Sequence, residues 1–212
     1  MNPEFHTGTA LAGALRKILR RLEQEIAPDA PICVYLAGGM AVHLYTGKRV
    51  TTDIDAEFSR RIVLPPDLTV DVTLEDGSEK LVYLDGNYNS TFGLMHEDYL
   101  EDALPINLGT GKFSVCVLAP VDLAVSKIAR LADSDKEDIA ELARAGLTTA
   151  EAIEQRAREA AKYCAAPPVL LEYNIRDAVE IARQAQTQKT PEQPLQERRW
   201  LSPKHQRGGL ER

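Results

Sequence analysis

A Gly38-Gly39 pair, directly after an apolar run and shortly before Asp53-Ile54-Asp55, constrains the fold more than any other feature of the chain. The apolar run, Ile32 to Ala37, has the length and composition of a strand buried on both faces. Two glycines allow a sharp turn there and let a ligand approach the main chain closely. A short helix over Met40–Tyr45 should follow, with its N-terminal N–H groups suited to phosphate oxygens.

Acidic residues alternate with apolar ones along the next stretch, Thr52 to Phe58. This alternation predicts a strand with Asp53, Asp55 and Glu57 on one face. Carboxylates that lie close together raise each other's pKa and cost stability, so a bound cation is the natural explanation for three of them. Mg²⁺ is the expected ion, because it is commonly held by one or two carboxylates together with substrate phosphate oxygens.

The order of these features resembles that of the nucleotidyltransferase superfamily. The chain looks most like the bacterial branch related to the AbiEii-type toxins, where a Gly-Gly pair precedes an Arg-x-Thr-x-Asp-x-Asp signature. Arg49, Thr51, Asp53 and Asp55 fill that signature. The resemblance implies that Asp53 and Asp55 are catalytic and bind Mg²⁺. It also implies a nucleotide site that includes Gly38, Gly39, Arg49, Thr52 and Lys127.

Lys127 belongs to a second stretch that supports the resemblance. Val115–Leu118 is expected to be a strand, and Pro120 opens a helix whose apolar stripe continues to Ala132. The relatives carry a Pro-x-Asp-Leu helix with a lysine that approaches the triphosphate, followed by an Asp-x-x-Asp-Ile pair. Lys127 and the pair Asp135 and Asp138-Ile139 match these positions, so the resemblance gives Lys127 a catalytic role; the alternative is a surface lysine.

Ser134 stands where many of the relatives have a second lysine. An ordinary structural interpretation also fits this segment. Ser134 and Glu137 have the spacing of a capping box, in which a serine and a glutamate open a helix.

These transferases usually take a third carboxylate from a later strand. The segment before it is predicted to be a hairpin, Val70–Leu74 and Leu81–Leu84, with Asp-Gly as its turn signal. A strand over Ser90–Asp98 should follow. We rank Asp98 first as the third acid, then Glu97, then Asp85; His96 is either a general base, a second metal ligand or a hydrogen-bonded histidine.

Composition sets broader limits. The chain has 212 residues and 44% apolar residues, enough for one packed core. Its three cysteines lack metal-ligand spacing, and no signal peptide or membrane-spanning stretch is evident, so we expect a soluble cytoplasmic protein without membrane contacts.

Three regions are predicted. Residues 1–146 should form an α+β core, a mixed sheet flanked by helices that begins with an amphipathic helix over Leu11–Ile26. Residues 147–186 should form a helical C-terminal part. It should consist of a helix capped by Thr148 or Thr149 that extends to Ala166, and another from about Val169 to Gln186. Residues 187–212, with six Lys or Arg against three Glu, should be a disordered basic tail in which Trp200 could tether a partner or RNA.

The predicted function is therefore Mg²⁺-dependent transfer of a nucleoside monophosphate from an NTP to an acceptor hydroxyl, with release of pyrophosphate. The acceptor (tRNA, protein or small molecule) and the base preference are not specified by the sequence. Two alternatives stay open: a catalytically inactive nucleotide-binding pseudoenzyme, and a toxin–antitoxin or phage-defence component with a protein partner.

Overall fold

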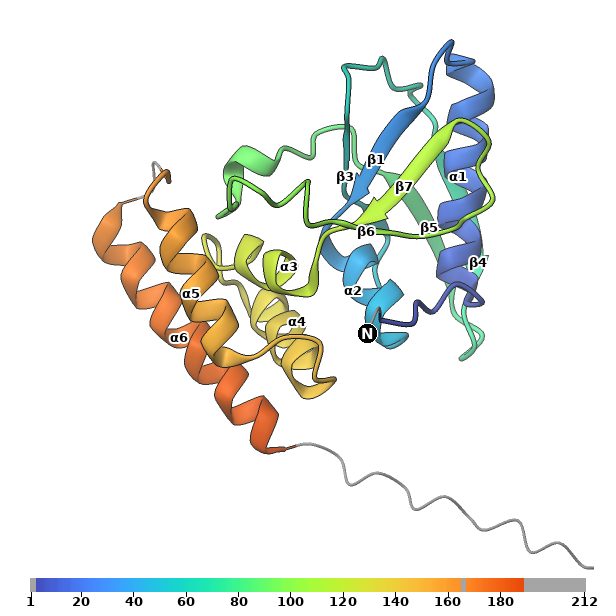
Figure 1. Ribbon diagram of the computed structural model, residues 1–212. Coiled ribbons are helices and arrows are strands. Elements are labelled where there is room, and N and C mark those ends of the chain that lie inside the picture. The colour runs from blue at the N-terminus through green and yellow to red at the C-terminus, as the bar shows by residue number, and fades with distance from the viewer. Residues whose placement is uncertain (1–2, 165–166, 189–212) are drawn as a thin grey trace, which may run out of the picture.

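The first helix and the strands it covers form one half of the molecule. The computed structural model describes residues 3–164 and 167–188. Helix α1 (Ala10–Ile26) buries the leucine and isoleucine stripe that its sequence predicts, and the Thr9 hydroxyl accepts from Ala12 N at 3.1 Å as its N-cap. It packs against β4 (Thr69–Thr73) and β5 (Glu79–Leu84), the two strands of the predicted hairpin (Figure 1).

Two small sheets share the described strands. The first has the order β3-β1-β7-β6, with β1 parallel to β7 and antiparallel to β3, so it is mixed as predicted. The second has the order β2-β5-β4, with β2 parallel to β5. Besides β4 and β5, these sheets contain β1 (Ile32–Leu36), β2 (Asp53–Ile54), β3 (Ala56–Phe58), β6 (Leu104–Pro105) and β7 (Phe113–Val117).

The predicted strand over Thr52–Phe58 is wrong in one respect, because it is broken at Asp55 and its two halves belong to different sheets. Before the break, Tyr83 N donates to Thr52 O, which ties the chain to β5. At the break, Asp55 O accepts from Ala37 N at 2.9 Å, and the chain then pairs with β1. Asp53 is thus held beside β5, and Asp55 is held beside the end of β1.

The described residues form six α-helices. Helix α2 (Gly38–Thr46) begins at the glycine pair. Gly47 follows it as the C-cap, with a left-handed φ of 71°. The remaining helices are α3 (Pro120–Ser126), α4 (Asp133–Arg144), α5 (Ala150–Ala161) and α6 (Pro168–Thr187). Helix α6 packs against α4 and α5, and α5 packs against α3, so the helical C-terminal part lies against the helices of the core (Figure 1).

Several predicted helix bounds are corrected. Helix α3 ends at Ser126 instead of continuing to Ala132, and the chain then turns through Leu131 at a φ of 46°. Helix α4 starts at Asp133, and Asp135 accepts from Ala132 N at 3.0 Å, so Ser134 and Glu137 do not form the predicted capping box. Helix α5 is capped by Thr149 but ends at Ala161, short of Ala166, while α6 agrees with its prediction within one residue. Trp200 and all but the start of the predicted tail lie outside the described residues.

The predicted strand over Ser90–Asp98 is also wrong. Asn89 accepts from Thr91 N at 3.0 Å and from the Thr91 hydroxyl at 2.8 Å, which caps a 3₁₀ turn, η1 (Ser90–Phe92). Further along, His96 Nδ1 accepts from Asp98 N at 3.1 Å. Such local bonds between side chain and backbone compete with extended structure, which explains why the alternating pattern does not form a strand.

Candidate active site

The carboxylates of the signature line a cleft of about 340 Å³ between the sheets and helices α3 and α4. Its charged side chains come from three segments of the chain. The signature segment provides Arg49, Asp53 and Asp55, the loop after β5 provides Asp85, and the segment from the end of α3 into α4 provides Lys127, Arg130, Asp135 and Asp138.

Asp55 and Asp85 lie close together because each follows one of two paired parallel strands. The register pairs Asp53 with Tyr83 and Ile54 with Leu84, so the next residue on each strand is an aspartate. Asp85 N also donates to Ile54 O at 3.0 Å. Parallel strands end at the same edge of a sheet, and three carboxylates therefore meet at the carboxyl ends of β2 and β5.

The two glycines are required by contacts with the signature itself. Gly38 has a φ of 58°, and a Cβ there would lie 1.8 Å from Asp55 Oδ2. A Cβ on Gly39 would lie 2.8 Å from Thr51 Oγ1. Close approach of the turn to the side chains of Asp55 and Thr51 thus explains the pair, whether or not a ligand also reaches the main chain.

The carboxylate of Asp55 is destabilised in its charged form. Burial, followed by the charges of Asp53 and Asp85, raises its pKa to about 6, although Lys127 and Arg130 act in the opposite direction. The Thr51 hydroxyl donates a hydrogen bond to Asp53 Oδ1. The two carboxylates offer only oxygen donors, and together with the excess negative charge around them this fits a hard divalent cation such as Mg²⁺.

Three cations among the described residues line the cleft together with these carboxylates. Lys127, which caps the C-terminus of α3, is buried with 8% exposure, and its Nζ lies 2.7 Å from Asp138 Oδ2 and 3.8 Å from Asp135 Oδ1. Arg130 donates through Nε and a terminal nitrogen to both oxygens of Asp135, each at 2.7 Å. Arg49 Nε lies 2.8 Å from Asp138 Oδ1, an ion pair in which that N–H is not directed at the carboxylate.

Asp135 and Asp138 therefore orient the cations of the cleft. Burial acts to raise the pKa of Asp135, but hydrogen bonds from Arg130 and from Ala132 N hold it below its ordinary value. Counted over the part of the chain that the structure describes, five carboxylates and three cations line the cleft. With all of them ionised its charge is minus two, which one divalent cation would balance.

His43 fixes the backbone that carries Arg49. Its Nδ1 lies 2.7 Å from Arg49 O, and its Nε2 lies 2.7 Å from the Thr9 hydroxyl at the start of α1. Burial lowers the pKa of His43, so the ring is neutral, with Nδ1 donating and Nε2 accepting. His43 thus connects α1, α2 and the signature segment.

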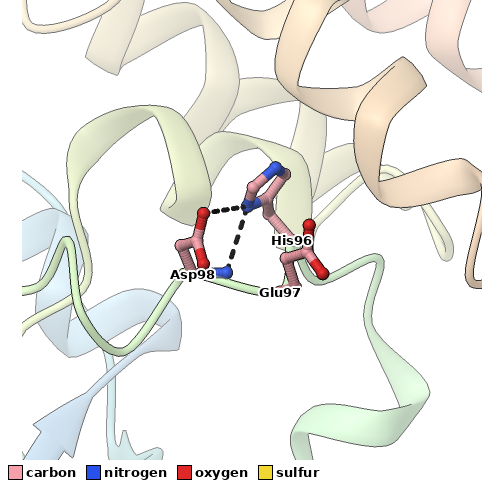
Figure 2. Close-up of side chains that lie close together, drawn as sticks. All are labelled: His96, Glu97 and Asp98. Carbon is pink, nitrogen blue, oxygen red and sulfur yellow. Dashed lines mark hydrogen bonds and ion pairs between the residues drawn. The ribbon is translucent and has the colours of Figure 1, made fainter.

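The acids ranked first and second as the third carboxylate do not line this cleft. Asp98 and Glu97 are exposed and lie beside His96, as Figure 2 shows. His96 Nδ1 accepts from Asp98 N, and its Nε2 lies 3.5 Å from Glu159 Oε2 on α5. The ligand atoms of His96, Glu97 and Asp98 lie within 4.8 Å of one another, but Nδ1 is already engaged, so we assign no metal site there.

Asp85, which was ranked third, is the acid that the structure brings to Asp53 and Asp55. Thr52 does not line the cleft, and the neighbouring Thr51 does. Arg130 was not predicted from the sequence to be a site residue, although its position three residues after Lys127 could have indicated that it lies in the same site. The pairing of β2 with β5, which explains the position of Asp85, has no comparable signal in the sequence.

The glycine turn, the two signature carboxylates, a lysine and two arginines thus line one cleft. Residues 13–189 match the family described as nucleotidyltransferase of unknown function (DUF6036), and the chain belongs to that family. Comparisons with curated proteins and with solved structures gave no significant match. Among the described helices, none combines the length and the apolar content that crossing a membrane requires.

Proposed function

We propose that this chain transfers a nucleoside monophosphate from an NTP to an acceptor hydroxyl and releases pyrophosphate. One observation carries the proposal: Asp53, Asp55 and Asp85 converge at the ends of two parallel strands and face Lys127 and Arg130 in one cleft. Family membership supports the same class of reaction.

Asp53 and Asp55 are the residues that would hold Mg²⁺. Asp55 is placed by its backbone bond to Ala37 and by contact with Gly38, and Asp53 by the hydroxyl of Thr51. Bound there, Mg²⁺ would help to neutralise the phosphate oxygens and the charge that develops during transfer.

Lys127, Arg130 and Arg49 would bind the triphosphate. Each is already ion-paired to Asp135 or Asp138, which holds the charged groups at the cleft before a nucleotide arrives. Pre-oriented charges of this kind lower the reorganisation that binding and transfer require.

Asp85 would accept the proton of the attacking hydroxyl. In the transfer step the acceptor oxygen forms a bond to the α-phosphorus, the bond between that phosphorus and the bridging oxygen breaks, and pyrophosphate leaves. The hydroxyl proton passes to the Asp85 carboxylate as general base. Asp85 Oδ1 accepts from Asn87 N at 2.8 Å, which fixes the carboxylate at the start of its loop.

Labelled nucleotides test the proposal. The protein is incubated with Mg²⁺, a bacterial cell extract and each NTP labelled on either the α- or the γ-phosphate. Label from the α-phosphate alone should appear on an acceptor, and Asp85→Asn should lower its rate by roughly 100-fold or more, as loss of a general base does. Transfer of γ-label would contradict the proposal. NTP binding without any transfer would favour the inactive pseudoenzyme.

The toxin–antitoxin or phage-defence alternative predicts a dedicated protein partner. It is tested separately, by purifying the chain from its native host and identifying what is retained with it. This alternative rests on the sequence resemblance alone.

A further inference from the structure

We propose that Phe92 is the platform on which the base of the bound nucleotide stacks. This inference deepens the proposed function and rests on it, because it assigns the part of the cleft that lies beyond the phosphate site. Phe92 has 82% of its surface exposed, yet it lines the same cleft as Asp53 and Lys127. A phenylalanine ring left in water lacks the stabilisation that burial gives, so a ligand that covers the ring would gain it.

The backbone around Phe92 is held firmly while the ring is left free. Phe92 N donates to Asn89 O at 3.2 Å, and Gly93 N donates to Ser90 O at 3.0 Å. The Ser90 hydroxyl in turn donates to the Tyr99 hydroxyl oxygen at 3.2 Å, and the Tyr99 hydroxyl donates its one proton to Glu57 Oε2 at 2.7 Å. A surface aromatic on a backbone with this many bonds is positioned for a ligand at little entropic cost.

The turn lies next to the proposed phosphate site. A Cβ on Gly93 would lie only 3.1 Å from Ser126 O, so the backbone beside Phe92 packs directly on the residue that precedes Lys127. The same Cβ would lie 3.4 Å from Met95 Sδ, which places the methionine against this turn as well. Phe92 and Lys127 are therefore on adjoining segments of the cleft wall.

The lining of the cleft has an apolar part and a charged part, just as a nucleotide has an aromatic base and a charged triphosphate. Among the described residues, Phe92 and Met95 are the two wholly apolar side chains that line it, and both lie in the segment 92–95, whereas the signature segment and the segment from α3 into α4 are charged. Every NTP combines a triphosphate with a flat aromatic base, and stacking on an aromatic ring accepts any base. We assign the Phe92 ring to the nucleotide's own base and not to the acceptor, because every NTP carries a base, whatever the acceptor is.

The test compares ligands with and without a base. Isothermal titration with Mg²⁺ measures the affinity of the full chain and of Phe92→Ala for ATP and for inorganic tripolyphosphate. Stacking on one aromatic contributes 1–3 kcal/mol per base, so Phe92→Ala should weaken ATP binding roughly 5- to 150-fold. Binding of tripolyphosphate should stay unchanged. Phe92→Trp should restore ATP affinity, whereas Phe92→Leu should not.

Tyr173→Ala is the matched control, because this tyrosine is 59% exposed on α6 and does not line the cleft. It should leave both affinities unchanged. Equal ATP affinity in wild type and Phe92→Ala would overturn the assignment while leaving the proposed function intact. Equal loss of ATP and tripolyphosphate affinity would also overturn it, because the turn would then act through the phosphate site. Absence of Mg²⁺-dependent binding of either ligand to the wild type would contradict the proposed function itself.

Discussion

Lys127 is a buried cation whose main partner, Asp138, is also buried. If it binds phosphate, Lys127→Met should lower NTP affinity roughly 10- to 100-fold, since a charged hydrogen bond is worth about 1.5–3 kcal/mol. The sequence alone predicts little effect on stability. The structure predicts a loss of about 1–3 kcal/mol, because Asp138 keeps only Arg49 as a partner.

A double variant separates the two effects. Lys127→Met with Asp138→Asn also removes the buried carboxylate that has lost its main partner, so thermal stability should recover in part while NTP affinity stays low. Affinity is measured by titration and stability by thermal unfolding. Recovery of NTP affinity together with stability would show that Lys127 acts on the fold and not on the nucleotide.

At the scale of single residues, the sequence predicted the signature better than its surroundings. Asp53 and Asp55 could be singled out because their spacing and the preceding glycines are local. Asp85 was ranked below Asp98 because its position depends on β2 pairing with β5, a contact between distant segments. The alternation over Ser90–Asp98 favoured Asp98, but the side chains of Asn89 and His96 accept hydrogen bonds from nearby backbone N–H groups, and that segment forms turns instead.

At the scale of elements, a buried ion pair joins α5 to α3. Arg156 donates to both oxygens of Asp122, at 2.7 and 2.9 Å, and Asp122 is the acid of the Pro-x-Asp-Leu helix. The Asp122 side chain is 1% exposed. Arg156→Met should therefore lower the free energy of unfolding by about 3–5 kcal/mol, because it leaves the buried Asp122 carboxylate without its ion-pair partner.

Arg158→Met is the control for this pair. Arg158 lies on the same helix, but its partners Glu154 and Glu172 are exposed, so the change should cost less than about 1 kcal/mol. Asp122→Asn combined with Arg156→Met should regain much of the loss. Denaturant unfolding measures all four proteins, and similar small costs for both single variants would refute a structural role for the Asp122 pair.

The elements themselves were largely predictable where one periodicity dominates. Helix α1 and the β4–β5 hairpin follow from apolar spacing and the Asp-Gly turn. The end of α3 was not predictable in this way. Its apolar stripe continues past Ser126, but Asn174 on α6 donates to Ile128 O and Ala129 O, at 3.0 and 3.3 Å, in the turn that follows.

At the scale of the whole molecule, we predict from the charge of the cleft that stability depends on pH and on Mg²⁺. The folded state raises the pKa of Asp55 from 3.8 to about 6, so the folded state binds its proton more tightly than the unfolded state. The stabilisation of the fold by protonated Asp55 is therefore complete below about pH 4 and is lost as the pH rises through about 6. In chelator at pH 7.5, Asp55→Asn should stabilise the protein by about 1–2 kcal/mol, allowing for partial exposure.

Two comparisons check this prediction by thermal unfolding. At pH 4 the advantage of Asp55→Asn over the wild type should largely disappear. At pH 7.5, added Mg²⁺ should stabilise the wild type and not the variant, because only the wild type binds the ion. A lower melting temperature for Asp55→Asn in chelator would show that the charged carboxylate stabilises the fold.

The central claim is that Asp53 and Asp55 bind nucleotide through Mg²⁺, and it is tested most directly by titrating a non-hydrolysable NTP analogue with Mg²⁺ and with chelator. The wild type should bind at least about tenfold more tightly with Mg²⁺, which corresponds to about 1.4 kcal/mol. Asp53→Asn with Asp55→Asn should abolish that gain. Glu97→Gln with Asp98→Asn, two exposed acids outside the cleft, should retain it. An equal Mg²⁺-dependent gain in the Asp53 and Asp55 variant and in the wild type would contradict the account.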